Sequence, residues 1–247
     1  IALTGSGQAV VTGGTLSTNF PIANAYQGTH SGTGGDGFVA KLSADGSSLV
    51  YSTYLGGSSI ENIWDVAVDS SGNAYLTGTT QSSDFPVTAG AYQETRPCTS
   101  NSNAFVTKLN SAGNGLIFST YLGGTTANSS GSAIGVGNDG TVFVAGETWA
   151  EDFPQDGMTN PEPMFPARMY LSQFASDGTS LIYSTGLADA WSSYIKDLLY
   201  DNGSIYLSGL VNEDGSIRIV NGFQTTKSGN GEGFIIKMIS SALDVLT

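Results

Sequence analysis

Candidate catalytic groups are the acidic side chains in the segments predicted to form loops. A pair of carboxylates can protonate and attack a glycosidic bond, but no spacing within the set selects such a pair. We therefore expect a protein without catalytic activity, with a glycan hydrolase or lyase as the alternative. The set comprises Glu61, Asp65, Glu147, Glu151, Asp152, Asp156, Glu162 and Asp189.

Three tryptophans are candidate ligand contacts, because none of them recurs at a matching place elsewhere in the sequence. Trp64, Trp149 and Trp191 are predicted to lie in loops on one face of the molecule, Trp64 and Trp191 near its central axis. A Trp ring among Asn, Gln, Ser and Thr suits a sugar ring or a protein partner. The alternative is that each ring only packs beneath its own loop.

The remaining residue types disfavour most other chemistry. His30 is the only histidine, and it lies in a glycine-rich stretch that is poorly suited to holding a general base in place. Zinc sites need clusters of His or Cys that the sequence lacks, so we expect no cofactor. A calcium ion that staples two loops is an alternative, although no EF-hand pattern of aspartates occurs.

Net charge and cysteine content limit the classes of partner that this protein is expected to bind. The 247 residues include 21 acidic and 8 basic ones, a formal net charge of −13, and the basic residues are scattered. Because phosphate backbones bind clustered Lys and Arg, we expect no nucleic-acid partner. We also expect no membrane insertion, because no apolar run approaches the length of a span. Cys98 follows Pro97 in a polar loop, so we expect an exposed thiol, either idle or bonded to another chain.

A recurring phrase indicates how these residues are positioned. The sequence YSTYLGG at 51–57 returns as FSTYLGG at 118–124, and in weaker form at 183–187. Short runs with alternating polar and apolar residues accompany each copy, so each unit is predicted to hold four strands, A to D. The glycines that precede strand B are Gly7, Gly72, Gly140 and Gly203, so the periods are 65, 68 and 63 residues.

Four antiparallel strands per unit predict an all-β fold, a β-propeller built from four repeats of about 65 residues. We expect a single domain with blades at 1–57, 58–124, 125–187 and 188–247, strand A innermost and the last strand D at 243–246. Tight turns are expected at the Asx-Gly pairs 45–46, 139–140, 177–178 and 202–203. Lys41, Lys108 and Lys237 recur on strand C, which predicts a structural pairing with the acid of strand A. The long B–C and D–A loops share the face that carries the tryptophans.

Motifs within the repeats resemble a known family, the bacterial and archaeal β-propeller repeat family abbreviated SBBP. The resemblance covers essentially the whole chain. It implies a secreted or surface-anchored module, often one piece of a long multidomain protein, and it brings no catalytic residues. The motifs are 65–69 (DVAVD), Gly72-Asn73, Thr77-Gly78, Asp84-Phe85-Pro86, Ala91-Tyr92-Gln93 and the STYLGG phrase, with Asn19-Phe20-Pro21 in the first copy and Asp152-Phe153-Pro154 in the third.

Ring closure is the open question of this fold, since propellers of the family are expected to have more than four blades. We favour a compact four-bladed ring over an open arc finished by another chain or a segment of a longer propeller. Ile1 opens within a strand pattern, so we expect it to follow a processed or excised segment. The expected function is a non-catalytic extracellular or cell-surface module that binds a protein or a glycan. The alternative is a self-assembling subunit of a surface layer or filament, because exposed edge strands pair readily.

Overall fold

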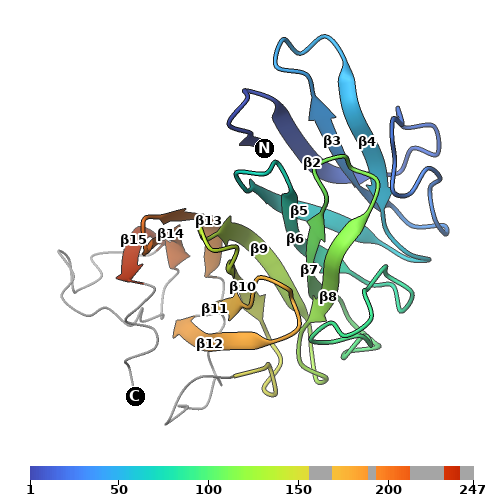
Figure 1. Ribbon diagram of the computed structural model, residues 1–247. Helices are drawn as coiled ribbons and strands as arrows, with labels where there is room; N and C mark the ends of the chain where they lie inside the picture. The colour runs from blue at the N-terminus through green and yellow to red at the C-terminus, as the bar shows by residue number, and fades with distance from the viewer. Residues whose placement is uncertain (156–168, 189–192, 212–230, 240–247) are drawn as a thin grey trace.

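The computed structural model describes residues 1–155, 169–188, 193–211 and 231–239, and in these ranges all regular structure is β-strand (Figure 1). The all-β prediction is therefore confirmed for this part of the chain. The strands form four antiparallel sheets, numbered here in chain order, and neighbouring strands in each sheet follow one another in sequence. This is the strand order predicted for propeller blades.

The bounds of the strands are as follows. Sheet 1 contains β1 (Ala2–Leu3), β2 (Ala9–Thr15), β3 (Asp36–Leu42) and β4 (Leu49–Leu55). Sheet 2 contains β5 (Glu61–Val68), β6 (Ala74–Thr80), β7 (Asn103–Leu109) and β8 (Leu116–Leu122). Sheet 3 contains β9 (Ser129–Val136), β10 (Val142–Thr148), β11 (Met169–Phe174) and β12 (Leu181–Ala188). Sheet 4 contains β13 (Tyr194–Asp201), β14 (Ser204–Val211) and β15 (Glu232–Ile239).

Short turns with a left-handed glycine join the first strand of each sheet to the second and, in sheets 1 to 3, the third strand to the fourth. The glycines of the four predicted Asx-Gly pairs all have positive φ, between 70° at Gly46 and 84° at Gly140. At Gly46 the amide donates to the Ser43 carbonyl at 2.8 Å, which is a type I turn closed by a left-handed residue. Only the pair Asn202-Gly203 has both residues at positive φ, 46° and 80°.

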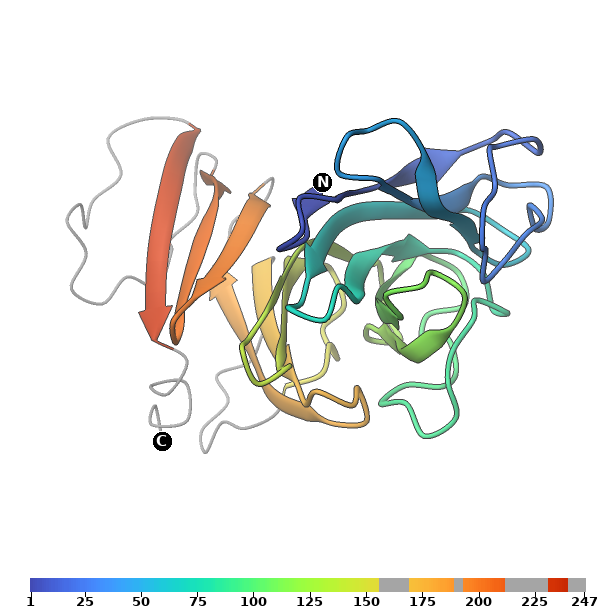
Figure 2. The same ribbon diagram turned by 45° about the horizontal axis from the view of Figure 1, so that its top comes forward.

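The four sheets stack face to face along an arc, with sheets 1 and 4 at its two ends (Figures 1 and 2). Each junction encloses its own apolar cluster. Val39 of sheet 1 shares a cluster with Leu76 of sheet 2, Val106 of sheet 2 with Val144 of sheet 3, and Leu171 of sheet 3 with Leu207 of sheet 4. No single sheet buries both of its faces by itself, so the core consists of these junctions.

A closed four-bladed ring, which we favoured from the sequence, is not seen. Among the described residues, the apolar clusters join sheets 1 and 2, 2 and 3, and 3 and 4, and none joins sheet 4 back to sheet 1. The fourth strand expected at 243–246 lies outside the described residues. Within the described ranges there is also no helix of the length and hydropathy needed to cross a membrane.

Candidate binding surface

The innermost strands of sheets 2, 3 and 4 share a bulge that turns one side chain out of the sheet. In β5, Ile63 pairs with Gly78 and Asp65 with Thr77, which leaves Trp64 without a partner residue. The same skip leaves Ser132 unpaired in β9 and Lys196 unpaired in β13. A bulge re-aims the extra side chain, so one position of the repeat carries three different residues along the inner edge of the arc.

These bulges explain a glycine that recurs on the neighbouring strand. A Cβ at Gly78 would collide with the Asn62 carbonyl oxygen, and one at Gly146 would collide with that of Ser130. The bulge presses the inner-strand backbone onto β6 and β10 at these points, and only glycine leaves room for it. The recurring Thr77-Gly78 strand end is therefore a property of the scaffold.

Trp64 lies in strand β5, so its predicted placement in a loop was wrong. It is 59% exposed, and the bulge carries it on the inner edge of the arc. Trp149 opens the loop after β10, as predicted; it is 42% exposed, and its amide donates to the Asn128 carbonyl at 2.9 Å. Trp191 lies outside the described residues. The two described rings are both substantially open to solvent.

Two of the candidate acids join successive sheets. Asp65 accepts hydrogen bonds from the amide of Val66 and from the amide of Ile134 in sheet 3, both at 2.8 Å. Burial raises the pKa of Asp65 above its ordinary value, and these two amides oppose the rise. Glu147 accepts from Ser132 Oγ at 2.5 Å and from the Ile195 amide of sheet 4 at 2.8 Å. Both carboxylates serve the junctions between sheets.

Other candidate acids hold loops in place. Glu61 is buried and accepts from Thr80 Oγ1 at 2.7 Å and from the Gly57 amide at 2.8 Å. Asp152 accepts from the side chains and amides of Thr125 and Thr126. Burial alone would raise the pKa of Asp152, but these hydrogen bonds lower it to about 2. Glu151 is exposed, and Asp156, Glu162 and Asp189 lie outside the described residues.

The Phe-Pro and Tyr-Gln motifs also have structural roles. The ring of Phe85 packs 4.6 Å from that of Phe105, and the ring of Phe153 packs 4.3 Å from that of Tyr170. Gln93 donates to the Gly123 carbonyl and accepts from the Gly123 amide, both at 3.0 Å. Residues shared among the repeats therefore build the scaffold, and ligand contacts are better sought where the repeats differ.

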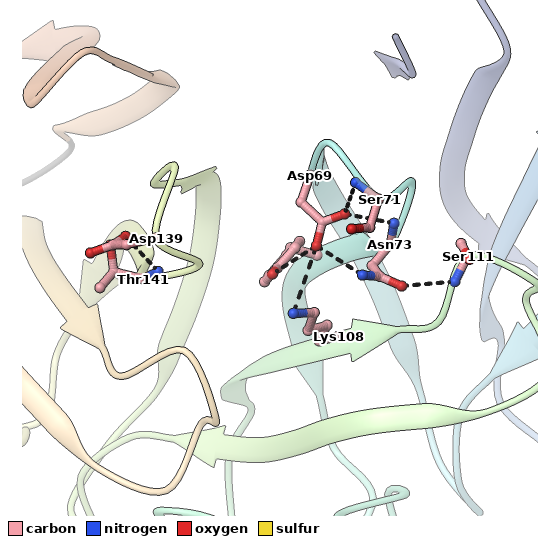
Figure 3. Close-up of polar contacts among 8 residues, drawn as sticks. Asp69, Ser71, Asn73, Lys108, Ser111, Asp139 and Thr141 are labelled. Carbon is pink, nitrogen blue, oxygen red and sulfur yellow. Dashed lines mark hydrogen bonds and ion pairs between the residues drawn. The ribbon is translucent and has the colours of Figure 1, made fainter. Parts of the chain in front are cut away.

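The turns at the opposite ends of the strands form a polar network, drawn for sheet 2 in Figure 3. Asp69 accepts from the amides of Ser71 and Asn73 at 3.0 and 2.9 Å, and Lys108 lies 3.7 Å from its carboxylate. Burial alone raises the pKa of Asp69, but Asn73, Tyr75 and Lys108 bring it below the ordinary value. The predicted pairing of the strand C lysine with the strand A acid is confirmed for Lys108.

Cys98 and His30 complete the candidates. Cys98 is a free thiol that is fully buried, with its amide donating to Asn103 Oδ1 at 3.2 Å, so the expected exposure was wrong. Its hydrogen-bond contacts are with Ser100, Asn101 and Asn103 of the same loop, which folds around the side chain. The half-buried His30 ring lies edge-on to Tyr54 at 5.6 Å. Among the described residues, no group of three or more His, Cys, Asp or Glu could hold a metal ion.

Comparison of the bulges adds candidates that the sequence reasoning missed. Lys196 occupies the position of Trp64 in sheet 4, and its Nζ lies 5.5 Å from the centre of the Tyr194 ring, which is itself exposed. The signal was present in the sequence, because Trp64 and Lys196 each precede an aspartate, Asp65 and Asp197, of the innermost strand.

Residues 50–86 match the family model described as a beta-propeller repeat, SBBP. The matched segment runs from β4 through β5 and β6 to the Asp84-Phe85-Pro86 motif, and it confirms the suspected repeat family there. A comparison with curated proteins found no match.

Proposed function

We propose that this chain is a non-catalytic, propeller-type module that binds a protein or a glycan outside the cell, at the inner edge of its arc. The observation that carries the proposal is the bulge position, which holds Trp64, Ser132 and Lys196 on an otherwise repeated scaffold. Trp64 is more than half exposed there. Nothing in the repeat requires a tryptophan at this point, since Ser132 and Lys196 serve the same bulge.

The side chains along this edge suit recognition. An exposed indole offers a flat apolar face for a sugar ring or an apolar side chain, and its N–H is a hydrogen-bond donor. Lys196 and Tyr194 add a cation and a second ring from sheet 4. Trp149, in the loop after β10, is a second exposed tryptophan that a ligand could contact.

The proposed absence of catalysis rests on the structural hydrogen bonds that the candidate acids accept. Glu61, Asp65 and Glu147 each accept hydrogen bonds that fasten loops or sheets, so a proton-transfer role would compete with these contacts. Incubation of the protein with a panel of polysaccharides, followed by a reducing-sugar assay, tests this part. Release of reducing ends that disappears in Glu147→Gln would contradict it.

The binding test compares Trp64→Ala and Trp149→Ala with the unaltered protein on a glycan array and against extracellular protein extracts. A ring at the centre of a binding site contributes more than about 1 kcal/mol, so loss of Trp64 should weaken binding roughly tenfold. Ile117→Ala is the control, because Ile117 is also exposed but lies on the outermost strand β8. Binding that survives both Trp changes would refute the proposed surface. Protease accessibility of the protein on intact cells tests the location.

A further inference from the structure

The three junctions between sheets are built in the same way. Each sheet has a front face, which packs on the following sheet, and a rear face, which packs on the preceding one. Val39 in sheet 1, Val106 in sheet 2 and Leu171 in sheet 3 lie on front faces, and each belongs to the apolar cluster shared with the next sheet. All three side chains are fully buried.

Sheet 4 repeats this front face, and among the described residues no sheet follows it. Ile235 pairs with Ser208 as Val106 pairs with Thr77, so Ile235 takes the place of Val106. It is 82% exposed, whereas its three equivalents are at 0%. Leu199 of β13 and Ile239 of β15 are also more than half exposed.

The rear face of sheet 1 is the complementary case. Phe38 occupies the place of Phe105 in sheet 2 and of Tyr170 in sheet 3, because each of them pairs with the glycine of strand B. Phe105 and Tyr170 are fully buried against the preceding sheet, whereas Phe38 and Leu42 are partly exposed. Sheet 1 therefore carries a rear face of the repeated type that none of the described sheets covers.

The turn between the third and fourth strands of a sheet gives independent evidence that the rear face of sheet 1 is uncovered. Gly113 of sheet 2 lies against the Tyr51 ring of sheet 1, and its carbonyl accepts from the Tyr26 amide at 3.0 Å. Gly178 of sheet 3 lies in the same way against Phe118 of sheet 2. Gly46, the equivalent glycine of sheet 1, has nothing within 4 Å of the position that a Cβ would occupy.

Charge also matches between the two uncovered faces. Lys41 reaches from sheet 1 to the Ser111 carbonyl in the turn of sheet 2, at 3.3 Å. Lys237 is the equivalent lysine of sheet 4, and it is exposed beside the Tyr206 ring. If sheet 1 of a second copy followed sheet 4, Lys237 would meet the turn that carries Asp45. Asp45 is exposed, and hydrogen bonds from Ser43 and Ser47 lower its pKa to about 2. Asp45 is therefore charged at neutral pH and opposite in sign to Lys237.

We propose that the front face of sheet 4 in one copy binds the rear face of sheet 1 in a second copy, head to tail. The contact reproduces the junction that the chain forms three times within itself, with Ile235 in the apolar cluster and the turn of Gly46 seated on the partner. Such a contact uses different surfaces on the two copies, so it closes into a ring or extends into a filament according to the angle between copies.

Sedimentation velocity or light scattering over a dilution series tests the proposal. The unaltered chain should form dimers or larger species that dissociate on dilution, and Ile235→Asp should raise the dissociation constant at least tenfold. Ile117→Asp is the control, because Ile117 is also an exposed isoleucine, 47% against 82% for Ile235, and lies on strand β8 of sheet 2, so this change should leave association unaltered. Because Ile235 is outside the core, far-UV circular dichroism should be the same for both variants.

Two further variants probe the other half of the contact. Gly46→Ala should weaken association, whereas Gly90→Ala, with a similar φ of 80° and equally open surroundings, should not. Asp45→Lys and Lys237→Glu should each weaken association, and their combination should restore it. A monomer at every concentration would overturn the proposal. So would association that survives both Ile235→Asp and Gly46→Ala, or association that Ile117→Asp abolishes equally.

Discussion

Two glycines in equivalent turns give the sharpest test of how the sheets pack on one another. Gly46 and Gly113 have nearly the same left-handed conformation, with φ of 70° and 76°. Alanine at either position must adopt a conformation that costs an L-residue about 1 to 2 kcal/mol. Only at Gly113 would the new methyl group also meet the Tyr51 ring of the preceding sheet.

The magnitude follows from this difference in surroundings. An extra methyl group in a packed interface costs about 1 to 3 kcal/mol. Gly113→Ala should therefore lower the free energy of unfolding by about 2 to 5 kcal/mol, and Gly46→Ala by about 1 to 2 kcal/mol. Because the backbone term is common to both, the excess loss at Gly113 reports the contact between sheets 1 and 2.

Urea unfolding followed by tryptophan fluorescence provides the assay, at protein concentrations low enough for the chain to be monomeric. Replacement of Tyr51 by Leu in the Gly113→Ala background should make room for the methyl group and remove part of the excess, as a double-mutant cycle. Equal losses for the two alanine variants, or an excess that Tyr51→Leu leaves unchanged, would refute the account of the junction.

Two more predictions follow from individual side chains. Phe153→Ala should lower the free energy of unfolding by about 3 to 5 kcal/mol in the same assay, because the ring is buried against Tyr170, whereas a loss below about 1 kcal/mol would contradict this packing. Asp152→Asn should reduce the loss of stability in acid. The pKa of Asp152 is about 2 in the folded protein and about 3.9 in the unfolded chain. The stabilisation by the Asp152 carboxylate is therefore present above about pH 4 and is lost as the pH falls toward 2. Glu151→Gln is the control, and equal acid profiles for the two variants would refute the assignment.

The strands of each sheet could be predicted from the sequence because their signals are local. Alternation along Phe105 to Leu109 and the turn glycines at 46, 140, 178 and 203 were enough to place strands and hairpins. Ring closure is different, since it depends on the summed rotation across all junctions and no single residue encodes that rotation. The open arc could therefore be seen only in the assembled structure (Figure 2).

Trp64 shows a second limit of the sequence reasoning. The strand was predicted to begin at Asp65, although Trp64 continues the apolar alternation of Val66 and Val68. The pairing of Ile63 with Gly78 extends β5 past this point and absorbs the extra residue as a bulge. Period-2 patterning cannot register an inserted residue, so the bulge at Trp64 was not predicted from the sequence.

The three lysines of strand C show how one repeated residue acquires different roles from its neighbours. Lys108 pairs with Asp69 inside its own sheet, and Lys41 reaches the turn of the next sheet. Lys237 has the same strand position, but it sits on a face that no described sheet covers. Because Lys41 serves a junction between two sheets, its equivalent Lys237 is proposed to be placed for a junction as well. The charge-swap pair Asp45→Lys and Lys237→Glu tests this inference directly, because only a contact between copies can link these two residues.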